Sequence, residues 1–320
     1  MSRAARKLVR RSTSAKTARL ARPPAAPQLT VAEFASTWLH TRTLSLGLKP
    51  NTVSGYATRL RMHILPYWGA RSMASITSDD VDAWRDRMIE ARKLGRSSIN
   101  LNLTTFRTML RTAARKKIIH DMPEVQRLRG EDEERPWLTE EEYELVVEAA
   151  GELELRKLAF VLLGGDAGLR IGEMLNLRRD HIEDNTISIK GTRSKGHEGS
   201  TKTEKGRRRV PMTKRLRKCL DALARERPVG NRVLARDGDE PCTEAMLRGW
   251  LEQAVRLSEI AKTGISPHSL RHTFISHLDA KGVPVTVIQR LVGHSNLATT
   301  QKYLHMDEDR IKAAIAALRD

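Results

Sequence analysis

The stretch DMPEVQRLRGEDEERPW separates two parts of the chain that each show helical patterning. It is acidic, bounded by prolines and without a hydrophobic period, which is typical of a connection between packed elements. A chain of 320 residues also suits two domains with separate hydrophobic cores. We therefore predict an interdomain linker over residues 119–135, with one domain on each side.

The first predicted domain covers residues 28–118 and consists of four or five short helices. Its large apolar residues recur at helical spacing, so each helix presents one stripe to a shared core. Pro66 and Gly69, in HILPYWG, are expected to end one of these helices. The stripes are formed by Phe34, Trp38, Val53, Tyr56, Leu60, Ile64, Val81, Trp84 and Met88.

The second predicted domain covers residues 136–307 and is mainly helical. Thr139 and Glu142 have the spacing of a capping box at the start of its first helix. A β-hairpin is predicted where the strand-like segments TISIK and RRRVPM flank the turn GTRSKGHEGS. The expected fold class is therefore mostly α, with a helical N-terminal domain and a mixed, mainly helical domain that contains a small β-hairpin or sheet.

The charge of the chain indicates a polyanionic partner. The net charge is +18 and the isoelectric point is about 10.3, values that favour nucleic acid as the partner. Residues 186–218 alone hold twelve Lys or Arg against two Glu. Because aromatic residues make up only 4% of the chain, contacts to the backbone of double-stranded DNA are expected rather than stacking on single-stranded bases.

Residues 1–27 hold eight Lys or Arg and no acidic residue. This composition cannot bury a core, so we expect a disordered basic arm, with a transit peptide as the competing interpretation. No apolar run is long enough to span a bilayer, and two cysteines, Cys219 and Cys242, do not suggest a disulfide framework. No membrane association and a cytoplasmic, nucleoid-associated location are therefore expected.

An ordered set of polar residues in the second domain indicates phosphoryl transfer. A phenol has an ordinary pKa of about 10, so Tyr303 would need a proton acceptor and nearby cations to attack a phosphate. His268 and Arg271 are three residues apart in SPHSLRHTFISHLDAKG, and they would project from one face of a helix. Together with Arg170, Arg271 could place paired N–H donors on one phosphate.

Each of these residues also has a simpler interpretation when taken alone. His268 and His272 have a spacing that can seat zinc on a helix, although no third ligand is evident. His294, between Gly293 and Ser295, could simply mark the end of a helix, and Tyr303 could be a core aromatic. Only the joint pattern favours catalysis.

The joint pattern resembles the tyrosine recombinases of the phage integrase family. Four motifs carry the resemblance, in the order of the family and at about its spacing: AGLRIGEMLNL, TKTEKGRRRVPM, HSLRHTFISHL and LVGHSNLATTQKYLH. The resemblance covers nearly everything after residue 28 and implies that residues 28–118 are the core-binding, SAM-like domain. It also implies a site-specific DNA recombinase that needs no ATP, metal or other cofactor.

The resemblance implies a role for each site residue. Tyr303 would attack the scissile phosphate to give a 3′-phosphotyrosyl link, with Arg170 and Arg271 bound to the phosphate. His268 would act as general base and then acid, and His294 would hydrogen-bond the phosphate. Lys202 would protonate the departing 5′ oxygen, and Lys190 is the alternative for that role.

The family also implies partners and leaves several functions open. A homotetramer on paired DNA sites and an accessory directionality factor are expected. The tail at 308–320 has one apolar helical face that docks either on a neighbouring protomer or on its own domain. An integrase of a phage or other mobile element is favoured; the alternatives are a chromosome-dimer-resolving recombinase, a type IB topoisomerase and a catalytically silent DNA-binding protein.

Overall fold

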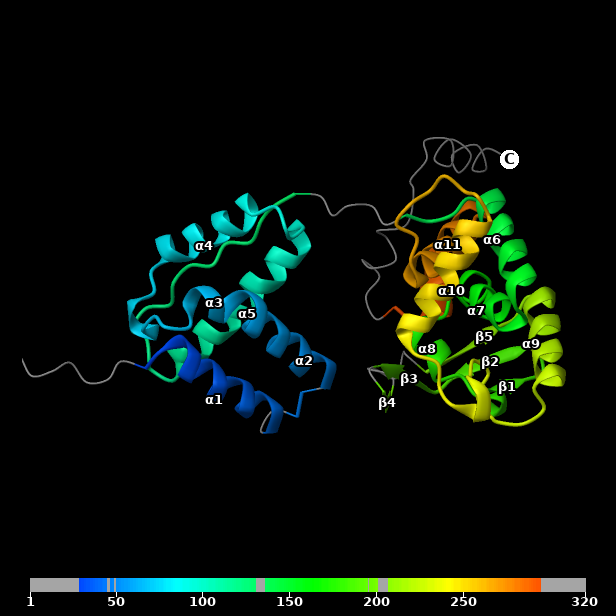
Figure 1. The fold of residues 1–320 in the computed structure, drawn as a ribbon, viewed down its shortest axis with the longest axis horizontal. Coiled ribbons are helices and arrows are strands. Elements are labelled where there is room, and N and C mark those ends of the chain that lie inside the picture. Colours follow the sequence, from blue (N-terminus) through cyan, green and yellow to red (C-terminus); the bar gives the residue numbers. More distant parts are fainter. Residues whose placement is uncertain are drawn as a thin grey trace, which may run out of the picture. The chain divides into compact units, whose positions relative to one another are not determined.

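The computed structural model describes residues 29–44, 47–48, 50–130, 136–194, 196–200 and 207–294. The chain divides into two compact units, Met1–Asp132 and Glu133–Asp320. Within the described residues, the first unit is built from helices, and the second combines helices with two small antiparallel sheets (Figure 1). The predicted fold class is confirmed. The basic arm at 1–27 and the tail at 308–320 lie outside the described residues.

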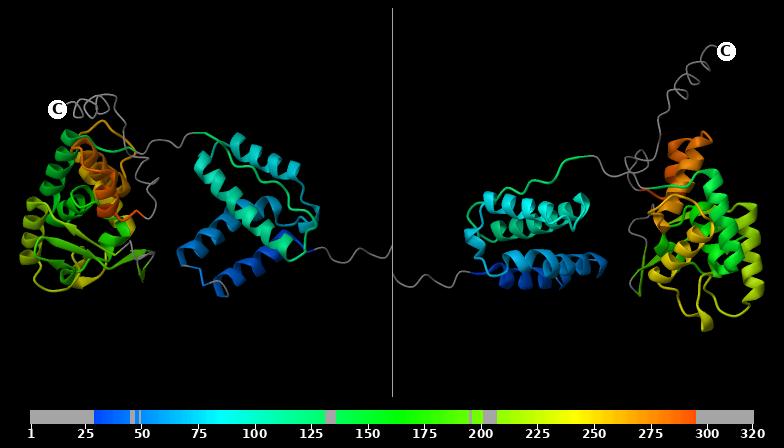
Figure 2. Two further views of the ribbon diagram at one scale, coloured as in Figure 1. Left: turned by 180° about the vertical axis from the view of Figure 1, so that it is seen from behind. Right: turned by 45° about the horizontal axis from the view of Figure 1, so that its top comes forward.

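The first unit contains two pairs of helices in contact, α1 with α2 and α4 with α5 (Figure 2). Its core is centred on Phe106, whose ring stacks on Trp68 at 4.8 Å and meets Trp84 edge-on at 5.3 Å. Most of the predicted stripe residues are buried, while Val53 and Tyr56 are half-buried. The helices are α1 (Val31–Leu44), α2 (Pro50–Arg59), α3 (Leu65–Trp68), α4 (Ser78–Glu90) and α5 (Arg96–Arg115).

Pro66 does not end a helix, in contrast to the expectation from the sequence. A π-helical turn at Leu60–Ile64 joins α2 directly to α3, and Pro66 lies in the first turn of α3. The wider turn lets Leu65 donate its N–H to Leu60, and a proline is tolerated at the start of a helix because its missing N–H has no partner there. Gly69 does cap the end of α3.

The segment at 119–130, expected to belong to the linker, packs on the first unit. Ile119 and Val125 are buried in its core, 4% and 6% exposed. The side-chain amide of Asn100 fixes the backbone of Leu128 from both sides, since its Nδ2 donates to the carbonyl and its Oδ1 accepts from the N–H. This pairing through one distant side chain has no periodic signature in the sequence. Residues 131–135 lie outside the described part of the chain.

The second unit is organised around α7 (Leu155–Gly165), which contacts α6, α9, α10 and α11. Two glycines permit the close crossings. A Cβ on Gly164 would lie 2.7 Å from the Cβ of Leu270, and one on Gly165 would lie 2.3 Å from the Tyr143 ring. The other helices are α6 (Glu140–Leu153), α8 (Ile171–Leu175), α9 (Lys214–Glu226), α10 (Glu244–Leu257), α11 (Pro267–Ala280) and α12 (Val285–Val292).

The predicted hairpin strands pair, but the segment between them is more than a loop. β2 and β5 are antiparallel, with Ile187 opposite Val210 and Ile189 opposite Arg208, and β1 adds a third strand. β3 and β4 form a separate two-stranded sheet between them in sequence. The strands are β1 (Ile182–Glu183), β2 (Thr186–Ile189), β3 (Gly191–Ser194), β4 (His197–Ser200) and β5 (Arg208–Pro211).

Candidate active site

Arg170 stands at the N-terminal cap of α8, directly after a tight turn that follows α7. Gly168 in this turn has a φ of +62°, and a Cβ there would lie 2.4 Å from the Phe274 ring. The main-chain N–H of Arg170 donates to Glu173 Oε2 at 2.8 Å, and its Nη1 donates to Oε1 at 3.0 Å. The Arg170 side chain is 37% exposed. The backbone of Arg170 is therefore fixed, while its guanidinium can still reach an anion.

Arg271 is buried in α11, with 1% of its surface exposed. Its Nη1 donates to the Gly168 carbonyl at 2.5 Å, and its Nη2 donates to the Val292 carbonyl. His268 lies one turn earlier on the same helix and is half-buried, with its ring 4.7 Å from that of His272. Arg271 thus connects the turn that presents Arg170 to the end of α12.

The C-terminal end of α12 brings three arginines together. A helix leaves its last carbonyls without intrahelical partners, and here three consecutive carbonyls each accept a guanidinium N–H. Arg208 Nε donates to Leu291 at 2.6 Å, Arg271 Nη2 donates to Val292, and Arg170 Nη2 donates to Gly293 at 3.2 Å. Gly293 then turns the chain with a φ of +66°.

His294 follows this turn and is 8% exposed. Burial, together with the positive charges of Arg271 and Arg170, lowers its pKa to about 3. His268 and Arg208 contribute to the same shift. The structure therefore gathers four of the sequence-predicted residues, Arg170, His268, Arg271 and His294, around one helix end. At neutral pH, His294 is an uncharged imidazole that can donate one N–H to an anion.

The depressed pKa of His294 gives stability a defined pH dependence. Because the folded pKa, about 3, lies below the ordinary 6.5, this contribution is complete above pH 6.5 and is lost as pH falls toward 3. We expect the loss of this contribution to lower the free energy of unfolding by about 1–2 kcal/mol between pH 7 and pH 5. Urea unfolding of wild type and His294→Asn at both pH values measures it. The asparagine variant should lose less stability, while exposed His197→Asn should behave as wild type; identical losses in all three would contradict the expectation.

Sequence reasoning missed two residues of this cluster, Glu173 and Arg208. Both side chains are buried, 4% and 5% exposed, and they form two parallel hydrogen bonds of 2.9 Å. Burial raises the pKa of Glu173, but the hydrogen bonds and charge of Arg208, with the charges of Arg170 and Arg271, lower it to about 2. The available signal was alternation in β5, where Arg208 shares the inward face with buried Val210.

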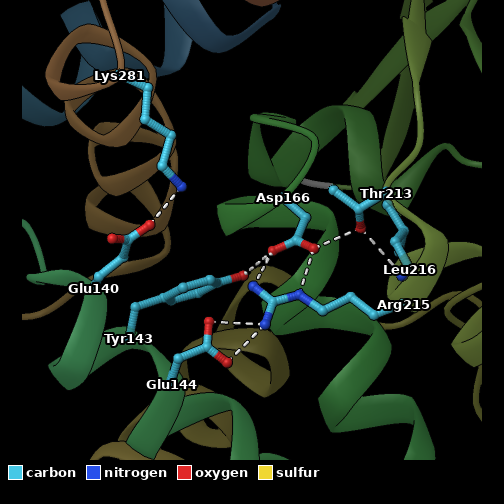
Figure 3. A network of polar contacts seen from close by, with 8 residues as sticks. All are labelled: Glu140, Tyr143, Glu144, Asp166, Thr213, Arg215, Leu216 and Lys281. Carbon is cyan, nitrogen blue, oxygen red and sulfur yellow. Dashed lines mark hydrogen bonds and ion pairs between the residues drawn. The ribbon is translucent and has the colours of Figure 1, made fainter.

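A second polar network is centred on Asp166, which caps the end of α7 just before the turn to Arg170 (Figure 3). The buried carboxylate of Asp166 accepts hydrogen bonds from Tyr143 of α6 at 2.8 Å and from Thr213 at 2.6 Å. Arg215 of α9 donates to both Asp166 oxygens at 2.7 Å, and it also pairs with the exposed Glu144. The network links α6, the end of α7 and the start of α9, and thereby supports the turn that presents Arg170.

Removing the charge of Asp166 should destabilise this unit. In Asp166→Asn, an amide N–H₂ would replace a carboxylate oxygen that accepts from several donors, so we expect the free energy of unfolding to fall by about 2–4 kcal/mol. Glu144→Gln is the matched control, because Glu144 contacts the same Arg215 but is exposed; it should cost less than about 1 kcal/mol. Urea unfolding measures both. Equal effects of the two substitutions would show that burial of Asp166 does not matter.

The remaining site candidates lie partly outside the described residues. Lys202 and Tyr303 are among the undescribed positions. Lys190, the alternative to Lys202, is exposed directly after β2. Burial lowers the pKa of His181; the charge of Asp180 acts against this shift, and the positive charge of Lys190 acts with it. The choice between the two lysines, and the assignment of Tyr303, stay predictions.

Metal-ligating side chains do not cluster in the described part of the chain. Among those residues, no group of three or more His, Cys, Asp or Glu side chains is arranged to hold a metal ion. Within the same ranges, no helix combines the length and the apolar character that crossing a membrane requires. Cys219 and Cys242 are both buried free thiols, and burial raises the pKa of Cys219 to about 11.

Comparison with known proteins agrees with the two-unit fold. Residues 136–310 match the phage integrase family, and residues 30–89 match the phage integrase N-terminal SAM-like domain. The chain is 33% identical over 183 residues to a tyrosine recombinase of Thermosipho africanus, and the aligned region covers 55% of this chain and 60% of that protein. It is 28% identical over 284 residues to the tyrosine recombinase XerC of Halalkalibacterium halodurans, covering 82% and 89%.

Among solved structures, the integrase of transposon Tn1549, in complex with transposon right end DNA, has a similar fold. The TM-score is 0.80 at 21% identity, covering 91% of this chain and 100% of that one. At that identity the likeness concerns the fold alone. The match to the family establishes more than the fold. It spans more than half of the chain, and the matched residues include Arg170, Arg271 and His294. The chain belongs to the phage integrase family.

Proposed function

We propose that this chain is a site-specific DNA recombinase, the integrase of a phage or other mobile element, which cleaves and rejoins DNA through Tyr303. The observation that carries the proposal is the gathering of Arg170, Arg271, His268 and His294 around the end of α12. Three of these can donate hydrogen bonds to one phosphate, and Tyr303 follows His294 by nine positions in the sequence.

In the proposed reaction, the Tyr303 oxygen attacks the scissile phosphorus while His268 accepts the phenolic proton. Charge that develops on the non-bridging oxygens is stabilised by the two guanidinium groups and by the N–H of neutral His294. The bond from phosphorus to the 5′ oxygen breaks, and Lys202 protonates that oxygen. A 3′-phosphotyrosyl link and a free 5′-hydroxyl result.

The rejoining step reverses this sequence with a 5′-hydroxyl from a second strand. One phosphodiester is exchanged for another, so bond energy is retained and the reaction needs no nucleotide and no metal. Two DNA sites present four strands, and one Tyr303 for each strand corresponds to four copies of the chain. We therefore propose a homotetramer on paired double-stranded sites, acting at the nucleoid, with an accessory directionality factor as a further partner.

The covalent intermediate gives the direct test. The full-length protein is incubated with end-labelled DNA that flanks its own gene, and detergent-resistant adducts are sought. A label at the 5′ end of the cleaved strand should stay with the protein, while a 3′ label should leave on a fragment that polynucleotide kinase can phosphorylate directly. Tight binding without an adduct on any flanking fragment would favour a catalytically silent DNA-binding protein.

The products of the reaction distinguish an integrase from related enzymes. Joining of two different sites on separate molecules indicates an integrase, whereas resolution between identical sites on one molecule indicates a dimer-resolving recombinase. Relaxation of a supercoiled plasmid without any defined site would instead favour a type IB topoisomerase. The hairpin β3–β4, which lengthens the connection that carries Lys202, is the feature of this chain that favours an integrase.

A further inference from the structure

Arg208 is a buried arginine to which the proposed chemistry gives no role. It begins β5, opposite Ile189, and its side chain lies on the inward face of the strand. Its neighbour Arg209 lies on the outward face, with a side chain 66% exposed and 3.7 Å from Glu183. Two adjacent arginines of one strand therefore occupy opposite environments.

All three guanidinium nitrogens of the inward-facing Arg208 donate hydrogen bonds. Nη1 and Nη2 each donate to one oxygen of Glu173 at 2.9 Å, and Nε donates to the Leu291 carbonyl at 2.6 Å. Planar, bidentate pairing of this kind is the strongest arrangement between arginine and a carboxylate. Arg208 thus joins the strand to α8 and to the end of α12.

Glu173 also contacts Arg170, which is the reason that the pairing matters for chemistry. Arg170 Nη1 donates to Glu173 Oε1 at 3.0 Å, while its Nη2 reaches the Gly293 carbonyl. A buried carboxylate needs a cation close by. Without Arg208, Glu173 would take the half-exposed Arg170 as its main partner, and the charge of Arg170 would be offset before DNA arrives.

We propose that Arg208 is a positioning residue of the recombination site: by pairing with Glu173 and the Leu291 carbonyl, it keeps the Arg170 guanidinium available to the scissile phosphate. This assignment rests on the proposed function. It adds a third arginine that acts through another residue and does not itself touch the phosphate. The cluster of three arginines and one glutamate keeps a net positive charge for an anionic ligand.

The test is single-turnover cleavage of a nicked DNA substrate that traps the covalent adduct. Arg208→Met should cleave about 10–100-fold more slowly than wild type, because one transition-state contact is weakened rather than lost. DNA binding should change by less than about 3-fold, since all three guanidinium nitrogens of Arg208 already donate to groups of the protein. Arg209→Met is the matched control, and its cleavage rate should stay near that of wild type.

A double variant separates positioning from general support of the fold. Arg208→Met with Glu173→Gln removes the carboxylate that captures Arg170, so it should cleave faster than Arg208→Met alone, within about 10-fold of wild type. It also removes the buried carboxylate that Arg208→Met alone would leave without its main partner, so it should fold even if the single variant does not. A folded double variant that cleaves more than about 100-fold slower than wild type would overturn the assignment.

The controls distinguish this assignment from the proposed function itself. If wild type forms adducts but Arg208→Met cleaves as fast as Arg209→Met, the positioning role is wrong and the recombinase function stands. If wild type forms no adduct on any flanking DNA, the proposed function fails, and the assignment fails with it. Circular dichroism of each variant shows that the compared proteins are folded.

Discussion

Tyr303→Phe is expected to bind DNA as wild type does and to form no covalent adduct at all. The substitution removes a single oxygen, the proposed nucleophile, and leaves an aromatic ring of nearly the same size. No other group in the proposed mechanism can take over the attack on phosphorus, so the loss should be complete rather than partial. Gel mobility measures binding, and detergent-resistant adducts on flanking DNA measure the chemistry.

The chain offers a matched control for this experiment because it contains only four tyrosines. Tyr67→Phe removes a phenolic oxygen from the first unit, where the ring packs edge-on against Trp68 at 5.0 Å. This variant should form adducts as wild type does. Adducts that persist in Tyr303→Phe would rule out Tyr303 as the nucleophile and direct the search to the other three positions.

Arg170→Ala should form adducts about 10²–10³-fold more slowly than wild type, which is the usual effect of removing one preorganised donor to a developing anion. The two bonds from Arg170 to Glu173 and Gly293 would also be lost. DNA binding should hardly change, because one contact among many phosphate contacts contributes little. The initial rate of cleavage on a nicked substrate at saturating protein measures the effect.

The control for Arg170→Ala is an exposed arginine of the same unit, Arg225 near the end of α9. Arg225→Ala removes the same charge without touching the cluster, so its cleavage rate should remain near that of wild type. A slow rate in both variants would show that overall charge, and not the position of Arg170, governs the reaction.

Local rules predicted much of this fold. The capping box at Thr139 and Glu142 forms, since it depends only on residues three apart. The stripe of Val81, Trp84 and Met88 is buried because its spacing matches the turn of a helix. The strands around the hairpin pair as expected. Each of these features depends on residues that lie close together in the sequence.

The polar contacts that sequence reasoning missed depend on distant partners. Glu173 and Arg208 are 35 residues apart, and their pairing requires the register of β5 as well as the position of α8. The amide of Asn100 fixes Leu128 across 28 residues. Such contacts follow from the assembled core, so a periodic pattern does not reveal them.

The carbonyl groups that bind Arg271, one of them at the end of α12, displace hydration water from its guanidinium during folding. Arg271 is 1% exposed and already donates to Gly168 and Val292, so its guanidinium is dehydrated as the chain folds. A phosphate that reaches this group does not first have to strip a hydration shell from it. The free-energy cost of dehydrating Arg271 is therefore met during folding rather than when DNA binds. These side chains lower the stability of the DNA-free protein and at the same time speed strand cleavage, so stability and activity oppose each other here.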